Sequence, residues 1–364
     1  MSTRPVSSLA QVNAGWLSEA LRGAGALQSG CVAALSVEAS ESNWSRMVWI
    51  RAYYSADARG ELPAQLALKI CADSREAFGP SEVFYYTRDY RGQPRIPLLR
   101  CYHAAYQEQP RAYHLLLADV RATHSDGFRR QVTRELALAT ADALARLHAP
   151  YWGAQRLATL GCTPAIEAEL DAYFAHIGPG LEPLLDAVGS TLSERHRGVV
   201  RTILGEHPRL LRQRIRDADG FTLVHGDLNP GNVLWPREGT SPVYLIDRQP
   251  FDWSLQCWLG ASDLARAMIL PWLPELRRPW QLDVLRQYQS SLQREGIELS
   301  WPALLYDYRL AALESVEIAV EWCSSPETLE SRRELWQWQL ERSLQAVDEL
   351  AALELLAPGV TRPS

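Results

Sequence analysis

The chain has 364 residues, which is long for one small hydrophobic core and favours two lobes or domains. Its hydrophobic fraction of 47% and charged fraction of 22% are those of an ordinary globular protein. The formal net charge of −6, without any run of lysine and arginine, argues against a protein that binds nucleic acid.

Strand patterns dominate the first third of the chain. The sequence predicts a short amphipathic helix at 14–22 and a second helix at 81–90, and a polar turn at 41–45 separates the first two strands. The expected strands are 32–40, 47–54, 65–70 and 112–117. We therefore expect residues 1–120 to form a small, β-rich N-terminal lobe.

Helical periodicity takes over in residues 121–364. The strongest amphipathic pattern is 132–148, and a strand–loop–strand segment at 221–247 interrupts the helices. The other helical patterns are 163–218, 276–295, 301–323 and 328–356. The expected fold class is therefore α+β and bilobal, with a hinge near 118–123 before a larger, mostly helical C-terminal lobe. A cleft between two such lobes is a common place for a ligand.

Targeting and membrane segments are not expected. Residues 1–5 have no apolar core behind them, as a signal peptide would. The most apolar stretch, 267–273, contains Pro271 and is too short to span a bilayer. The six cysteines form no Cys-x-x-Cys pair, so neither a zinc site nor a disulfide framework is predicted. We therefore predict a cytoplasmic protein without a membrane partner.

The clearest chemical signal is His-Gly-Asp-Leu-Asn-Pro-Gly-Asn-Val-Leu at 225–234, followed by Tyr-Leu-Ile-Asp at 244–247. Phosphoryl transfer needs an acceptor hydroxyl in line, a base for its proton, and cations that neutralise the phosphate oxygens. Asp227 lies in a loop from which a carboxylate can reach a hydroxyl. Asn232 and Asp247 offer the hard oxygen ligands that Mg²⁺ prefers. A plain turn rich in Asp, Asn, Gly and Pro is the alternative interpretation.

This combination resembles the aminoglycoside phosphotransferase and choline kinase-like (ecdysteroid kinase-like) family of the protein-kinase-like superfamily, which shows His-Gly-Asp-x-x-x-x-Asn followed by Ile-Asp. The resemblance covers roughly residues 14–270. It implies Asp227 as the catalytic base, Asn232 and Asp247 as Mg²⁺ ligands, and ATP as the phosphate donor. It also implies a small-molecule acceptor with a hydroxyl group, such as an antibiotic, amino alcohol, sugar or natural product.

Lys69 supports this interpretation independently, because it is the single lysine among 37 basic residues. It stands in the apolar strand 66–70, where a kinase places the lysine that holds the α- and β-phosphates. Glu82, on the next helix, is its expected partner, and Glu76 is the alternative. A lone lysine in a strand is otherwise an edge or solvent residue.

The remaining nucleotide contacts have weaker signals. Ala118 and Val120 lie in a segment that resembles the family's hinge, whose backbone would meet adenine, although a buried strand reaching the surface looks the same. Ser42 and Asn43, in the turn between the first two strands, can supply donors to phosphates. That turn lacks the glycines of protein kinases, so a plain polar hairpin is the alternative.

Other residues near these motifs have expected structural roles. Asp263 resembles an acid that braces the loop of Asp227, His225 is expected to shape the backbone of that loop, and His148 is expected to be packed and hydrogen-bonded. Arg248 stands where the family usually has an aromatic residue, and it either reaches a phosphate or acidic substrate or pairs with a surface acid.

Three glutamates share one face of a C-terminal helix because of their i, i+3, i+7 spacing: Glu314, Glu317 and Glu321. That face either lines the acceptor pocket, which would favour a cationic or polyhydroxylated acceptor, or is a solvated acidic stripe.

Two functions from different classes remain open at this point. One is an active small-molecule kinase, and the other is a nucleotide-binding pseudokinase with a regulatory or scaffolding role. A pseudokinase usually lacks the base or a metal ligand, whereas Asp227, Asn232, Asp247 and Lys69 are all present. No stretch resembles the activation segment of a protein kinase, which counts against a protein substrate. The motif indicates the reaction but leaves the acceptor, ATP versus GTP, and the oligomeric state open.

Overall fold

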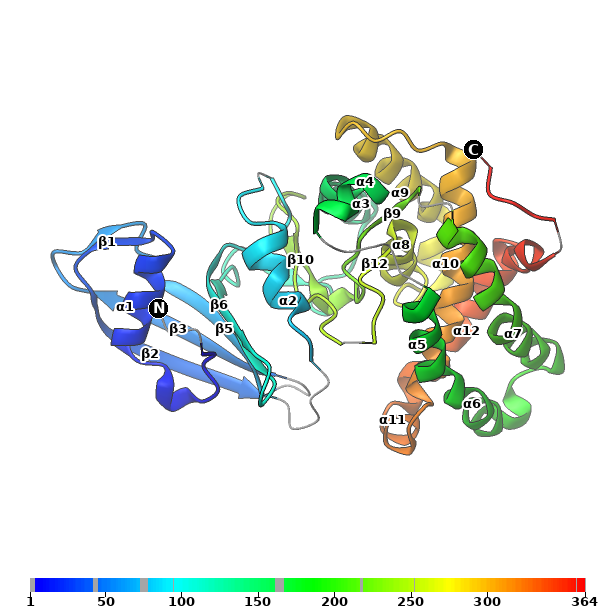
Figure 1. The fold of residues 1–364 in the computed structure, drawn as a ribbon, viewed down its shortest axis with the longest axis horizontal. Helices are drawn as coiled ribbons and strands as arrows, with labels where there is room; N and C mark the ends of the chain where they lie inside the picture. The colour runs from blue at the N-terminus through cyan, green and yellow to red at the C-terminus, as the bar shows by residue number, and fades with distance from the viewer. Residues whose placement is uncertain are drawn as a thin grey trace. The chain divides into compact units, whose positions relative to one another are not determined.

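The structure is a computed structural model that describes residues 4–41, 45–72, 78–93, 95–160, 167–216, 219–251, 253–357 and 359–363. The chain divides into two compact units (Figure 1). Unit 1 comprises Met1–Ser125 with two later segments, Pro236–Gly239 and Tyr244–Asp252. Unit 2 comprises Asp126–Trp235, Thr240–Val243 and Trp253–Ser364. None of the helices in the described ranges is long and apolar enough to cross a lipid bilayer.

Unit 1 is built on a five-stranded antiparallel sheet in the order β2-β3-β5-β7-β6. The strands are β2 (Val32–Glu41), β3 (Arg46–Tyr54), β5 (Gln65–Ala72), β6 (Cys101–Gln107) and β7 (Ala112–Ala118). Four of them confirm the predicted strands, whereas β6 was not predicted. Its sequence, Cys-Tyr-His-Ala-Ala-Tyr-Gln, lacks the Val, Ile and Leu run of its neighbours. A separate pair joins β1 (Leu27–Ser29) to β4 (Arg59–Gly60).

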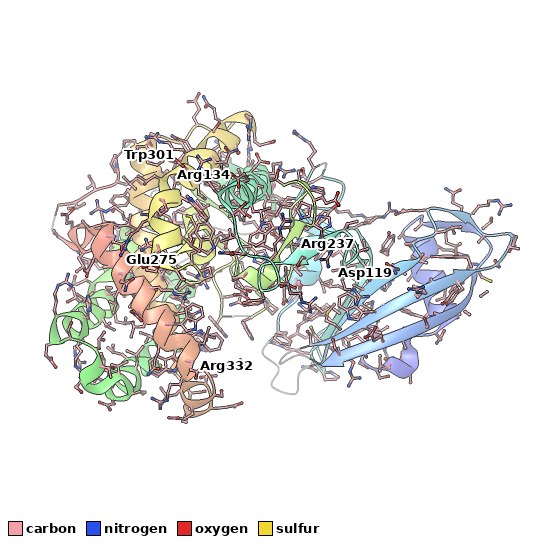
Figure 2. The ribbon with its side chains drawn as sticks, turned by 180° about the vertical axis from the view of Figure 1, so that it is seen from behind. Asp119, Arg134, Arg237, Glu275, Trp301 and Arg332 are labelled. Atoms are coloured by element: carbon pink, nitrogen blue, oxygen red, sulfur yellow. The ribbon has the colours of Figure 1, made fainter. Side chains whose placement is uncertain are left out.

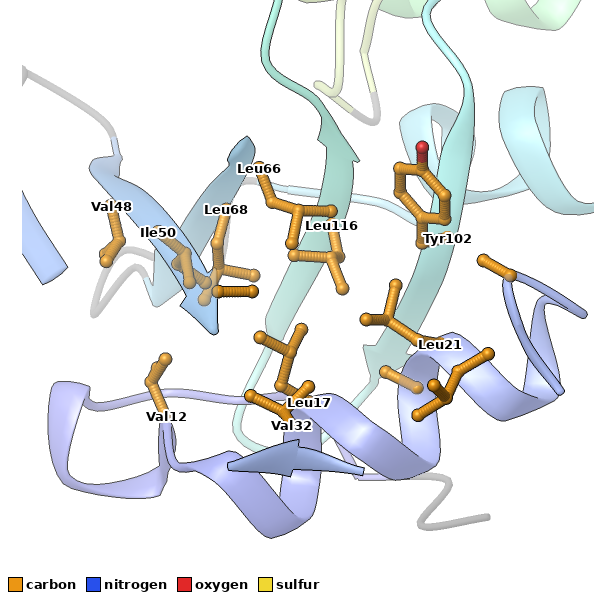
Figure 3. Packing of buried hydrophobic residues seen from close by; sticks show 14 of the residues in the cluster. Val12, Leu17, Leu21, Val32, Val48, Ile50, Leu66, Leu68, Tyr102 and Leu116 are labelled. Carbon is orange, nitrogen blue, oxygen red and sulfur yellow. The ribbon is translucent and has the colours of Figure 1, made fainter. Parts of the chain in front are cut away.

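Helix α1 (Ala14–Gly23) covers one face of this sheet. It begins as predicted at Asn13, whose side chain accepts a hydrogen bond from the amide of Trp16 at 3.0 Å. Leu17 and Leu21 of α1 are fully buried against apolar side chains that project from alternate positions of the strands (Figure 3). These side chains include Val48, Ile50, Leu66, Leu68 and Leu116. Lys69 alternates with Leu68 along β5 and therefore points to the other face of the sheet.

The helix predicted at 81–90 is one turn of α-helix, α2 (Ser81–Phe84), followed by a π-helical turn, Tyr85–Asp89. The amide of Tyr90 donates to the carbonyl of Tyr85 at 3.2 Å, which is the i to i+5 bond of a π-turn. Such turns are rare and frequently lie at functional sites. Here the turn directly follows α2, the helix that carries Glu82.

Unit 2 is mostly helical, and α10 lies at its centre, packed against α5, α7, α8, α9 and α12 (Figure 1). Its helices are α3 (Arg134–His148), α4 (Ala154–Leu157), α5 (Glu167–Ile177), α6 (Leu181–Val188), α7 (Glu194–Arg216), α8 (Gly260–Met268), α9 (Pro274–Arg294), α10 (Trp301–Trp322), α11 (Pro326–Ser331) and α12 (Arg333–Glu349). The pattern predicted at 163–218 is three helices, because turns at Gly178–Gly180 and Gly189–Thr191 break it.

Short strands lie in the segments between helices. They are β8 (His124–Asp126), β9 (Phe221–Leu223), β10 (Val233–Pro236), β11 (Tyr244–Leu245) and β12 (Cys257–Leu259). Within unit 2, β9 and β12 pair antiparallel, with Thr222 opposite Trp258. This pair places the segment that follows β9 next to α8, which begins directly after β12.

Candidate active site

The His-Gly-Asp loop leaves β9 in unit 2 through a turn that only glycine adopts easily. Gly226 has a φ of +83°, in the left-handed region where a side chain would clash with the backbone. His225 is 1% exposed, and its Nδ1 accepts a hydrogen bond from the amide of Asp227 at 3.4 Å. The imidazole therefore lies inside the turn and supports its backbone.

Asp263, in the first turn of α8, binds both backbone amides of this turn. Its Oδ2 accepts from the amide of His225 at 2.6 Å and its Oδ1 from the amide of Gly226 at 2.9 Å. His148 Nε2 lies 3.1 Å from the same Oδ2, while His148 Nδ1 lies 2.7 Å from the hydroxyl of Tyr288. His148 is thus buried and hydrogen-bonded, as predicted.

The pKa of Asp263 is lowered to about 2 despite complete burial. Burial alone would raise the pKa, because it disfavours the charged carboxylate. The hydrogen bond and charge of His148 and the amide of Gly226 outweigh burial. Asp263 is therefore a charged anchor of the loop at neutral pH.

Asp227 is held from two sides by amide side chains of its own loop. Asn232 Nδ2 donates to the carbonyl of Asp227 at 2.7 Å and to its Oδ2 at 3.1 Å. Asn229 Nδ2 lies 3.3 Å from the same carboxylate oxygen. These contacts fix the orientation of the Asp227 carboxylate, and they also fix which end of the Asn232 amide is its nitrogen. The role of Asn229 was not predicted, because a turn asparagine gives no signal distinct from ordinary turn chemistry.

In unit 1, Lys69 binds two acidic side chains. Its Nζ lies 2.6 Å from Glu82 Oε2 and also contacts Asp247 Oδ1. The hydroxyl of Tyr113 donates to Glu82 Oε2 at 2.5 Å. Glu82 is therefore the partner of Lys69 in the structure, and the alternative, Glu76, lies outside the described residues. Tyr113 was missed because sequence alone does not give the strand register that brings it to this face.

Burial and neighbouring charges have opposite effects on the pKa values of Lys69 and Glu82. Burial by itself lowers the pKa of Lys69, but the carboxylates of Asp247 and Glu82 outweigh it, and the pKa of Lys69 lies well above its usual value. Burial raises the pKa of Glu82, and the charge of Lys69 opposes that rise. The positive charge of buried Lys69 is thus maintained by its two carboxylate partners, whereas the pKa of Glu82 stays raised because burial outweighs the attraction of Lys69.

Asp247 has an unusual backbone, with a φ of +61°. Non-glycine residues in this region are uncommon and cluster at functional sites. The segment after it is bound to α2, since Ser81 Oγ donates to the carbonyl of Gln249 at 2.9 Å. Arg248 is 2% exposed and its guanidinium lies 4.9 Å from the centre of the Tyr85 ring. Arg248 is therefore a buried side chain that packs on an aromatic ring, and its reach to a phosphate or to an acid stays a prediction.

The proposed adenine contacts lie where β7 ends. The amide of Ala118 donates to the carbonyl of Arg100 at 2.9 Å, and the carbonyl of Val120 accepts from the amide of Thr123 at 2.9 Å. Figure 2 labels Asp119 in this segment; its carboxylate binds the guanidinium of Arg121 at 2.9 Å. The segment is therefore an ordered turn. The predicted phosphate donors, Ser42 and Asn43, lie outside the described residues.

The acidic face of α10 is buried inside unit 2, so the expectation of a solvated stripe is wrong. Glu314 is 6% exposed and accepts hydrogen bonds from Trp258 Nε1 at 3.1 Å and Ser262 Oγ at 2.7 Å. Glu317 is fully buried, 2.6 Å from His207 Nδ1. Only Glu321 remains partly exposed, 3.6 Å from His176 Nε2. Glu314 binds Ser262, the residue next to Asp263, and so supports the anchor of the His-Gly-Asp loop.

Comparison with known proteins identifies the fold. No family model matches the sequence, and no curated protein matches it. Solved structures do match. A spectinomycin phosphotransferase, solved in complex with ADP and spectinomycin, has a TM-score of 0.51 and 12% identity over 92% of this chain and 98% of that one.

Two further structures agree with this match. The ethanolamine kinase of Plasmodium vivax has a TM-score of 0.51 and 12% identity over 85% of this chain and 81% of its own. An aminoglycoside 2'-phosphotransferase in complex with GDP has a TM-score of 0.51 and 14% identity over 89% and 93% of the two chains. The chain therefore has the bilobal, kinase-like fold that the sequence resemblance implied, with a β-rich N-terminal part and a helical C-terminal part.

Proposed function

We propose that this protein is an ATP-dependent phosphotransferase that phosphorylates a hydroxyl group of a small molecule. The observation that carries the proposal is that the single lysine of the chain, the buried Lys69, binds both Glu82 and Asp247. A buried lysine held between two carboxylates is the arrangement that positions a phosphate clamp in kinases. The neighbours in fold, which include kinases of aminoglycosides and ethanolamine, are consistent with it.

In this proposal the residues of the His-Gly-Asp loop act on the acceptor. Asp227 orients the acceptor hydroxyl and takes its proton as the oxygen attacks the γ-phosphorus. The new bond joins that oxygen to phosphorus, and the bond from phosphorus to the bridging β–γ oxygen breaks, so ADP leaves. Lys69 binds the α- and β-phosphates, and the backbone at Ala118 and Val120 meets the adenine.

Asn232 and Asp247 fit the oxygen ligands of Mg²⁺. Within the described part of the chain, no group of three or more His, Cys, Asp or Glu residues is placed to hold a metal ion. Mg²⁺ does not need such a group, because it keeps several waters and takes its other ligands from phosphates. The half-exposed carboxylate of Asp247 and the oriented amide of Asn232 are donors of this kind. Bound Mg²⁺ would neutralise charge on the phosphate oxygens.

The cytoplasm is the cell compartment that fits the proposed function. Cys31, Cys71, Cys101 and Cys323 form no disulfide, as is expected of thiols in a reducing compartment. ATP, the proposed donor, is supplied there.

A coupled assay of ADP release tests the function. The purified protein is incubated with Mg-ATP and a panel of hydroxylated small molecules, including aminoglycosides, spectinomycin, ethanolamine, sugars and cyclitols. We expect ADP release that depends on one class of acceptor. Nucleotide binding without acceptor-dependent release across the panel would instead support the pseudokinase alternative.

Lys69→Arg is expected to lower kcat at least tenfold. The planar guanidinium is larger than the compact ammonium and cannot occupy the same buried position between Glu82 and Asp247. Turnover and circular dichroism are measured together, so that loss of fold is distinguished from loss of catalysis. Wild-type turnover in a folded variant would remove Lys69 from the mechanism.

A further inference from the structure

One large apolar side chain is far more exposed than any other in the described ranges. Phe128 is 77% exposed, whereas the other exposed large apolar side chains are between 45% and 52% exposed: Val37, Tyr53, Leu273 and Leu282. Isolated surface hydrophobics are normal and need no explanation. Phe128 differs from these side chains because it is held against the loop that carries Asp227.

The backbone of Phe128 is fixed to the catalytic loop within unit 2. The amide of the preceding residue, Gly127, donates to the carbonyl of Pro230 at 2.7 Å. Asp126 Oδ1 accepts from the amide of Phe128 at 3.0 Å and from that of Arg129 at 3.1 Å. The ring is therefore presented by an ordered turn on the loop that carries Asp227.

One edge of the ring rests on a glycine of that loop. A Cβ at Gly231 would lie 2.7 Å from Phe128 Cε2 and 3.2 Å from Cδ2, which is closer than carbon atoms approach. Gly231 thus provides the space that the ring edge fills. The ring is supported at this edge, and most of its surface is left to solvent.

A short chain of hydrogen bonds connects this glycine to the catalytic carboxylate. Asn229 Oδ1 accepts from the amide of Gly231 at 2.8 Å, and Asn229 Nδ2 lies 3.3 Å from Asp227 Oδ2. The aromatic ring and the carboxylate are therefore fixed to the same five residues of backbone, 227–231.

We propose that Phe128 is a stacking platform for a ring of the acceptor. The proposal rests on the proposed function and adds a subsite to it. A cyclic acceptor with an apolar face, such as a pyranoside or a cyclitol, lays its C–H groups on the aromatic ring and presents a hydroxyl to Asp227. An acyclic amino alcohol has no such face and gains nothing from the ring. The acceptor is the expected occupant, because Phe128 and Asp227 belong to the same unit and are held by the same loop.

A binding measurement tests the subsite without depending on catalysis. The protein is labelled with 4-fluorophenylalanine, and the fluorine resonance of residue 128 is assigned by its loss in Phe128→Leu. Mg-ADP is present throughout. The probes are methyl glucopyranoside and myo-inositol, with sorbitol and ethanolamine as acyclic counterparts. We expect a saturable shift of this resonance with at least one cyclic probe and none with the acyclic ones. No shift with either cyclic probe, or equal shifts with their acyclic counterparts, would overturn the proposal.

A kinetic measurement on the best acceptor of the ADP-release panel gives the second readout. Phe128→Ala should raise the acceptor KM about tenfold, the equivalent of losing one stacking contact, and leave the Kd of Mg-ADP unchanged. Leu282→Ala, which removes an exposed side chain of α9, is the matched control and should change neither value. A changed nucleotide Kd in Phe128→Ala would assign the ring to the nucleotide and refute the acceptor subsite. A resonance shift without phosphate transfer would keep the subsite and refute the phosphotransferase.

Discussion

Asp227→Asn is expected to bind Mg-ATP within a few-fold of the wild type yet to lose on the order of a hundredfold or more in kcat. Asparagine keeps the shape of the side chain, so the hydrogen bond from Asn232 Nδ2 to the backbone carbonyl at residue 227 is retained. It cannot accept the proton of the acceptor hydroxyl. Nucleotide affinity is assigned to Lys69 and the hinge backbone, which the substitution leaves intact.

Asp247→Asn is the informative comparison, because its carboxylate contacts Lys69 and is a proposed Mg²⁺ ligand. This variant should weaken metal-dependent nucleotide binding as well as turnover. Calorimetry with ATP, with and without Mg²⁺, and steady-state kinetics on both variants separate the two roles. Full phosphotransfer by Asp227→Asn would contradict the assignment of the base.

The sequence indicates the polar residues of this candidate site where a motif contains them. Asp227, Asn232 and Asp247 lie in two short runs, and Lys69 is recognisable because no other lysine competes with it. The strands around Lys69 are also predicted, since their sequences are short, largely apolar runs bounded by polar or Gly- and Pro-containing segments.

Contacts between distant segments are not predictable in the same way. The hydrogen bond from Tyr113 to Glu82 depends on a strand register, which a single sequence does not specify. The acidic face of α10 is a second example of this limit. Glu314 and Glu317 have the spacing of a solvated stripe, but Trp258, Ser262 and His207 come from other elements and satisfy them in the interior. Burial of a charge is decided by partners that the local pattern does not contain.

Asp263→Asn is expected to have the largest effect on stability, lowering the free energy of unfolding by about 3 kcal/mol and the Tm by about 6–12 °C. The carboxylate accepts from the backbone amides of His225 and Gly226 and from His148, and both histidines are buried. An asparagine has one oxygen to accept with, so at least one buried donor at the loop loses its partner. The same loss should displace the turn at Gly226 and reduce kcat.

The contribution of Asp263 to the free energy of unfolding should decrease as the pH is lowered. The pKa of Asp263 is about 2 in the folded protein, below its ordinary value of 3.8, so its contribution to stability is fully present above pH 4 and is lost as the pH falls toward 2. The shift corresponds to about 2 kcal/mol, of which roughly half is lost by pH 3. The stability difference between wild type and Asp263→Asn should therefore narrow by about 1 kcal/mol between pH 5 and pH 3.

Urea unfolding at the two pH values measures this difference. Asp283→Asn is the control, because it breaks a half-exposed ion pair with Arg134 at 2.7 Å and should cost less than about 1 kcal/mol at either pH. If Asp263→Asn is no less stable than Asp283→Asn, the carboxylate does not anchor the loop. If the difference between wild type and Asp263→Asn stays constant with pH, the carboxylate is not the charged acceptor of the two amides.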